Sequence, residues 1–95
     1  MNLVWTPESL DDLGEIYSYI GEHDRTAAKR MLERIHTIVE LHLPGAPNVG
    51  RPGRVAGTRE LVVPGTPFIV PYRVTTKTIE ILRVYHAARR WPSAF

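Results

Sequence analysis

The sequence predicts an α+β domain in which a short N-terminal strand and a helical hairpin precede a three-stranded antiparallel sheet. Three observations lead to this prediction. Apolar residues recur at helical spacing in the first half, strand-like alternation follows in the second half, and short turns separate the strands. The length of 95 residues, with 43% hydrophobic and 23% charged residues, is that of one ordinary globular domain covering 1–95.

The first elements are a strand and an acidic helix. Asn2 to Trp5 is predicted as a strand, and Thr6 and Pro7 supply an N-cap and a first helical residue. The apolar stripe of this helix, which ends near Gly21, consists of Leu10, Leu13, Ile16, Tyr17 and Ile20. The acidic residues lie mostly off the stripe, so we expect the acidic face to be solvated; they are Glu8, Asp11, Asp12, Glu15 and Glu22.

A second helix follows after a short turn, with Asp24 or Thr26 as its cap, and Leu43-Pro44-Gly45 stops it. Its apolar face is formed by Ala28, Met31, Leu32, Ile35, Ile38, Val39 and His42. Two amphipathic helices joined by so short a turn indicate an antiparallel hairpin.

The second half contains a loop and three strands. Residues 45–57 are rich in glycine and proline and predict a loop. The predicted strands are Thr58 to Val63, Phe68 to Val74 and Thr78 to His86, with a short tail from Ala87 to Phe95. Because proline cannot donate to a ladder, Pro71 is placed at a bulge or facing away from the neighbouring strand. We expect the helices to cover one face of the sheet and to leave the other open.

Charge is distributed unevenly along the chain. Residues 1–45 carry eight acids and four bases, whereas residues 46–95 carry eight bases and two acids. Seven of these eight bases are arginines, whose planar guanidinium groups suit carboxylate or phosphate. The second half therefore points to an anionic partner.

Other features exclude several function classes. The chain has no cysteine, which excludes thiol catalysis and cysteine-type zinc sites and favours the cytoplasm. Met1 to Trp5 has neither a basic region nor a long apolar run, so we expect no signal peptide, and no apolar stretch is long enough to span a membrane. Neither a metal site nor a nucleotide cofactor is expected, since the histidines lack ligand spacing and the Arg51–Arg54 loop does not match a phosphate-binding loop.

Four phrases of the sequence, in this order, resemble the RelE/ParE superfamily of type II toxins across essentially the whole chain. They are Trp5-Thr6-Pro7 leading into a helix with Tyr17-Ser18-Tyr19-Ile20, the glycine–arginine segment from Gly50 to Leu61, Pro71-Tyr72-Arg73-Val74, and the segment from Ile79 to Pro92. The resemblance implies a toxin that is neutralised by a DNA-binding antitoxin. It also implies one of two activities, which are poisoning of DNA gyrase in the ParE-like branch and cleavage of ribosome-bound messenger RNA in the RelE-like branch.

For the nuclease branch, the candidate residues are Arg59, Arg73 and Arg89 as cations and His86 as acid or base. Ribonuclease members typically have a lysine-rich patch and a tyrosine after the last strand. This chain has only Lys29 and Lys77, and no tyrosine follows Tyr85. These departures favour a ParE-like toxin that binds gyrase without catalysis and is neutralised by a ParD-like antitoxin.

For either target, the predicted partner-binding residues are Arg51, Arg54, Arg59, Arg73, Arg83, Arg89, Arg90 and Trp91. Each also has a purely structural interpretation: His86 as a strand-end residue bonded to backbone, Arg59 as a partner of a structural carboxylate, and Trp91 as a residue packed on the sheet. A third hypothesis is an interaction module that has lost toxicity.

Overall fold

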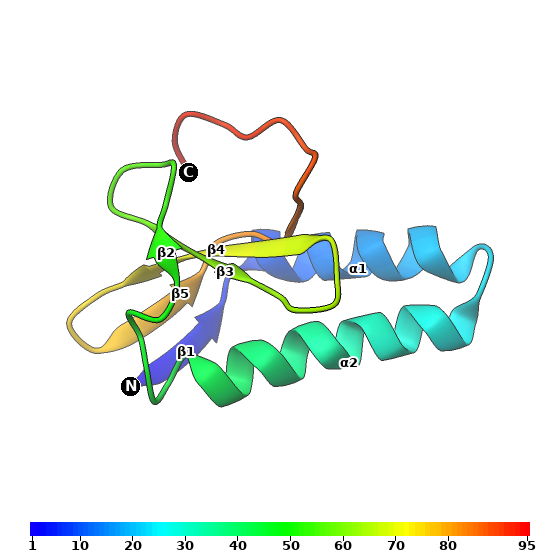
Figure 1. The fold of residues 1–95 in the computed structure, drawn as a ribbon, viewed down its shortest axis with the longest axis horizontal. Helices are drawn as coiled ribbons and strands as arrows, with labels where there is room; N and C mark the ends of the chain where they lie inside the picture. The colour runs from blue at the N-terminus through cyan, green and yellow to red at the C-terminus, as the bar shows by residue number, and fades with distance from the viewer.

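Two capped helices follow the first strand in the computed structural model, which describes residues 1–95 (Figure 1). Strand β1 spans Asn2–Trp5, α1 spans Pro7–Gly21 and α2 spans Arg25–His42. The Thr6 side chain accepts a hydrogen bond from the Ser9 N–H at 3.2 Å, and Asp24 accepts one from the Ala27 N–H at 3.0 Å. Of the two caps predicted for the second helix, Asp24 is therefore the one used. The helices pack against each other as the predicted antiparallel hairpin.

The sheet contains six strands rather than the predicted three. Its remaining strands are β2 (Arg51–Pro52), β3 (Arg59–Val62), β4 (Phe68–Val74), β5 (Thr78–Ile81) and β6 (Tyr85–His86). The order is β1-β5-β4-β3-β2, and β6 pairs with β4. The strand count differs because β1 joins the sheet parallel to β5, the proline-rich loop adds β2, and the predicted last strand is split in two.

A β-bulge causes the split. Tyr72 pairs with Ile81, and in the same register Ile69 would pair with Val84, but it pairs with Tyr85. One extra residue is therefore inserted between β5 and β6. The bulge lies opposite Pro71, whose carbonyl accepts a hydrogen bond from the Leu82 N–H at 3.0 Å. The N–H and C=O groups of one strand residue point to the same neighbouring strand. The N–H that Pro71 lacks would therefore also point to the bulged segment, where the ladder of hydrogen bonds is already interrupted. This confirms the predicted bulge.

The core lies between the helices and one face of the sheet, which is called the helix face here. Ile35 and Val39 of α2 and its C-cap residue Leu43 pack on alternate residues of the strands, among which Tyr72 and Val70 are fully buried. Three residues predicted on apolar helix faces are exposed instead. Leu10 is 52% exposed, Tyr17 is 43% exposed and His42 is also exposed, so the apolar stripe that faces the sheet is narrower than predicted.

The opposite face of the sheet, called the outer face, is not open as expected. The C-terminal segment arches over the side of the sheet away from α2, next to β2 (Figure 1). Ile69 and Pro71 of β4, which point to the outer face by alternation, are buried beneath the returning chain. The expectation was wrong because it assigned covering elements to the helices alone.

Candidate functional site

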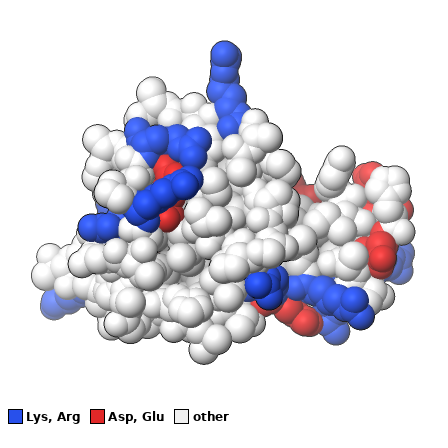
Figure 2. Space-filling view, in the orientation of Figure 1, with Lys and Arg blue, Asp and Glu red and all other residues white.

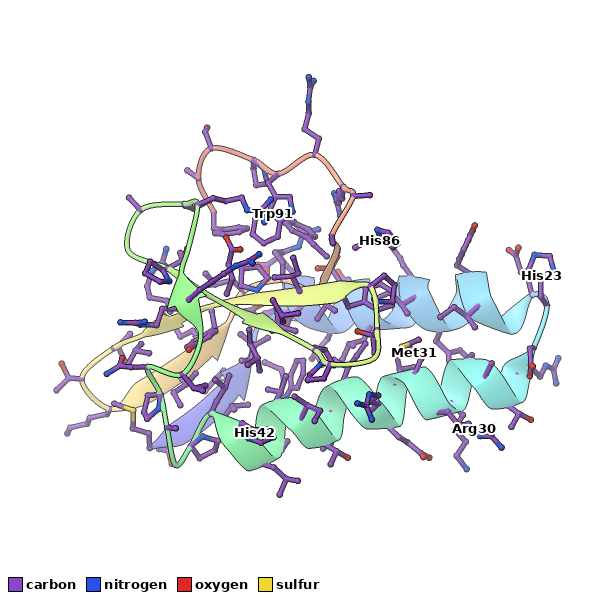
Figure 3. The ribbon with its side chains drawn as sticks, viewed as in Figure 1. His23, Arg30, Met31, His42, His86 and Trp91 are labelled. Atoms are coloured by element: carbon purple, nitrogen blue, oxygen red, sulfur yellow. The ribbon has the colours of Figure 1, made fainter.

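An apolar groove of about 710 Å³ lies between the helical hairpin and the start of β4. Its floor is formed by Ile16, Ile20, Met31, Phe68 and Val84. The walls have opposite charge, with Asp12 and Glu15 on the α1 side and His86 and Arg89 on the other. Met31 and His86 are labelled in Figure 3, where both flank this region. The groove therefore combines apolar area with charged edges, which is suited to an amphipathic partner.

Asp12 joins the groove to the β-bulge. Its carboxylate accepts hydrogen bonds from Arg83 Nε at 2.7 Å, from Arg83 Nη2 at 2.9 Å and from the Val84 N–H at 2.9 Å. Asp12 is 4% exposed, so the pair is nearly buried on its acidic side. The hydrogen bond with Asp12 raises the pKa of Arg83 above its ordinary value. Helix α1 therefore fixes the bulge, and with it the side of the groove that Val84 and His86 line.

A second carboxylate organises the outer face. Glu60 of β3 is 2% exposed and accepts hydrogen bonds from Arg51 Nε and Nη2 and from Arg54 N, Nε and Nη2, all between 2.8 and 3.2 Å. Basic atoms surround a small acidic spot over β2 and β3 in Figure 2, in agreement with this pairing. Burial by itself would raise the pKa of Glu60, but the hydrogen bonds from Arg54 and Arg51 outweigh it, so that the pKa lies below its ordinary value.

The C-terminal segment is held on this cluster by ring contacts. The Arg54 guanidinium lies 3.8 Å from the centroid of the Trp91 ring, and Trp91 meets Tyr85 edge to face at 5.1 Å. Trp91 therefore packs back on the sheet, as Figure 3 shows. Its Nε1–H is buried without a hydrogen-bond partner. Ring contacts rather than a hydrogen bond therefore hold the indole, and Glu60 supports them by orienting Arg54.

The four residues predicted for RNA cleavage are not brought together. Arg59 shares the helix face with Tyr72, its cross-strand partner, whereas Arg73 points to the outer face opposite Glu80. His86 pairs with Phe68 at the start of β4, and Arg73 lies five residues further along, or about 17 Å at the usual rise per residue. Only His86 and Arg89 share a site, the groove. The Nδ1 atom of His86 accepts a hydrogen bond from the Ala88 N–H at 3.0 Å, which leaves Nε2 as its free nitrogen.

The predicted partner-binding arginines form several internal contacts. Arg51 and Arg54 share one carboxylate, but their side chains are 51% and 44% exposed, and the trio keeps one net positive charge. Arg83 is paired with Asp12, Arg59 donates to backbone carbonyls, and Arg89 lies over the Tyr85 ring at 4.3 Å. Arg90 is exposed. Several of these arginines are therefore engaged within the chain, and Arg51, Arg54, Arg89 and Arg90 remain exposed.

Sequence reasoning missed Asp12 and the central position of Glu60. Asp12 was expected on a solvated acidic face. It lies four residues before Ile16 of the predicted apolar stripe, so helical spacing places both on one face, and this signal was available in the sequence. The burial of Glu60 had no such signal, because it depends on two arginines that return from the preceding loop.

Two further structural findings bear on function. His23, His42 and His86 lie at three separate places in Figure 3, and no group of three metal-ligating side chains comes together. No helix of the structure has both the length and the apolar character that crossing a membrane requires.

Comparison with known proteins places the chain among toxins. Residues 3–91 match the family model described as the ParE toxin of the type II toxin–antitoxin system parDE. The chain is 47% identical over 88 residues to the Y4kP protein of Sinorhizobium fredii, which carries a toxin designation, covering 93% of this chain and 90% of that protein. It is 40% identical over 87 residues to toxin RelE2 of Caulobacter vibrioides, covering 92% and 96%.

A solved structure agrees with these sequence matches. A chain of the chromosomal ParDE toxin–antitoxin system from P. aeruginosa superimposes with a TM-score of 0.83 at 35% identity. The match covers 90% of this chain and 95% of that one. The likeness therefore extends over the helical hairpin and the sheet together.

Proposed function

The chain belongs to the ParE toxin family of type II toxin–antitoxin systems, and on this premise we propose that it inhibits DNA gyrase by binding it and is neutralised by a ParD-like, DNA-binding antitoxin. We favour a binding mechanism because the side chains that RNA cleavage would need are dispersed in the structure. Arg59 and Arg73 lie on opposite faces of the sheet, and His86 is at the other end of β4. A binding inhibitor needs contact surface and no proton transfer, which this arrangement accommodates.

The proposal predicts which process fails first when the chain is produced in bacteria. Incorporation of labelled thymidine is expected to collapse before incorporation of labelled methionine, with induction of the DNA-damage response, because a poisoned gyrase leaves broken DNA. Co-production of the antitoxin encoded by the adjacent gene is expected to restore growth. Early loss of translation with cleaved messenger RNA would contradict the gyrase target, and harmless production would favour an interaction module without toxicity.

The groove is the surface that we assign to the antitoxin under this proposal. Its apolar floor and oppositely charged walls suit one face of an amphipathic helix. Ile20→Glu places a charge on this floor and is expected to weaken binding of the antitoxin at least about tenfold, since a buried unpaired charge is strongly unfavourable. Leu10→Glu on the same helix is the matched control, because Leu10 is 52% exposed and outside the groove.

Isothermal titration calorimetry with the purified antitoxin, alongside circular dichroism of both variants, measures this difference. Equal affinity of the Ile20→Glu and Leu10→Glu variants would place the antitoxin elsewhere.

A second candidate function is ribosome-dependent cleavage of messenger RNA. Two observations favour it: a relative at 40% identity is designated RelE2, and His86 and Arg89 line the same groove with the His86 Nε2 atom free. His86→Ala separates the candidates, because a nuclease that uses this imidazole would lose most of its activity, by about 10²–10⁴-fold, whereas killing by gyrase binding would persist.

A further inference from the structure

Arg59 is a half-buried cation that forms no ion pair with a carboxylate. It lies on the helix face of β3, where its Nη1 atom donates hydrogen bonds to the carbonyl oxygens of Gly50 at 2.8 Å and Asn48 at 3.3 Å. The arginines of the ion pairs are Arg51, Arg54 and Arg83, and Arg59 is not among them. Its charge is therefore solvated only in part and is paired only with neutral carbonyl groups.

The geometry of these bonds leaves one edge of the guanidinium free. Both hydrogen bonds use Nη1, so the Nε–H and the two Nη2–H donors have no partner within the chain. The Nε–Nη2 edge presents two parallel N–H groups, which is the arrangement that binds both oxygens of a carboxylate. Arg51 and Arg83 use this same edge for Glu60 and Asp12.

Arg59 also lines a pocket of about 410 Å³ at the foot of the sheet. The pocket is formed by Asn48, Pro52, Gly57, Thr58, Arg59 and Val74, so that Arg59 is its one charged residue. Gly57 has a φ of +78°, which favours glycine, and no atom lies within 4 Å of where a Cβ would be. The turn before β3 thus leaves room beside the guanidinium.

We propose that this pocket binds a single carboxylate of a protein partner, an Asp or Glu side chain or a chain terminus, through the Nε–Nη2 edge of Arg59. A lone cation with neutral neighbours matches one negative charge. A phosphate of a nucleic acid would be better served by several cations, and the pocket offers one. The proposal concerns only the chemistry of the contact, so it does not depend on whether the partner is gyrase or the antitoxin.

Nuclear magnetic resonance of the full chain tests the site with sodium acetate as the probe, at constant ionic strength maintained with sodium chloride. We expect saturable shifts, with a dissociation constant on the order of millimolar, at Arg59 Nε–H and at the amides of Gly57 and Thr58. Inorganic phosphate at the same concentration is expected to produce smaller shifts. No saturation with acetate, or a stronger response to phosphate, would overturn the proposal.

Variants distinguish the site from general attraction of anions. Arg59→Gln is expected to weaken acetate binding at least about tenfold, and Arg59→Lys should weaken it less, because lysine keeps the charge without the two-donor edge. Arg34→Gln is the matched control, since Arg34 also donates to a backbone carbonyl, that of Pro64 at 2.6 Å, but lies outside the pocket. Equal loss in the Arg34→Gln variant would overturn the assignment, and the titration of the unmodified chain decides the matter even if Arg59→Gln fails to fold.

Discussion

Replacement of Asp12 by asparagine is expected to lower the free energy of unfolding by about 3 kcal/mol, a larger effect than at Glu60, the other buried carboxylate. The carboxylate is 4% exposed and accepts three hydrogen bonds, two from Arg83 and one from the Val84 N–H. Its loss would leave the Arg83 charge without a partner at a site where its side chain is only 26% exposed. The expected loss lies at the lower end of the range for broken buried ion pairs, because about a quarter of the Arg83 side chain remains in contact with water.

Urea unfolding followed by circular dichroism measures this change, and the midpoint of thermal unfolding should fall by about 12–24 °C for a domain of this size. Asp11→Asn is the matched control, because Asp11 is the exposed neighbour on the same helix and is expected to change stability by less than about 0.5 kcal/mol. If the two variants unfolded at the same urea concentration, the stabilising role of the contacts between Asp12 and the bulge would be disproved.

Glu60→Gln is expected to have the second largest effect, a loss of about 2–3 kcal/mol. Glutamine retains one oxygen acceptor but removes the charge that Arg51 and Arg54 share, and both arginines are exposed enough to recover part of their hydration. Since Glu60 orients the guanidinium that stacks on Trp91, the tail should also loosen. In a Trp5→Phe background, the fluorescence of Trp91 is expected to shift to longer wavelength.

Stability should depend on pH through the same residue. The pKa of Glu60 is lower in the folded chain than its ordinary value of 4.5, so the folded state favours the charged carboxylate. The stabilisation is therefore complete above about pH 4.5 and is lost as the pH falls through the lower pKa of the folded state. Glu33→Gln, at an ion pair whose carboxylate is 64% exposed, is the control. Equal slopes of stability against pH for the parent and the Glu60→Gln variant would contradict this account.

The sequence was sufficient to predict the elements whose determinants are local. Thr6 and Asp24 are caps, Pro7 opens α1, and the turns of the second half follow from glycine and proline. The bulge opposite Pro71 was one of two predicted placements, because a missing N–H is a local property.

The rest depends on contacts between distant residues. The parallel pairing of β1 with β5 joins positions more than seventy residues apart, and no local pattern encodes it. The covering of the outer face depends on how Trp91 meets Arg54, again across a long separation. The candidate site was predicted as an exposed arginine surface, but alternation could not show that Glu60 would gather Arg51 and Arg54 around one buried carboxylate.

The proposed division of the surface follows from these contacts. The groove between the hairpin and β4 is assigned to the antitoxin, and the outer face with the exposed tail retains positive charge for a larger target. The two regions meet at the bulge that Asp12 fixes, so Asp12→Asn should affect the groove before it affects the outer face.

The most direct test of the proposed function is a supercoiling assay with purified gyrase, relaxed plasmid DNA and the purified chain. The account predicts inhibition of supercoiling with accumulation of cleaved plasmid, reversal by the antitoxin, and full retention of inhibition in the His86→Ala variant. Undiminished supercoiling at a large excess of a chain that is folded and toxic in cells would contradict it.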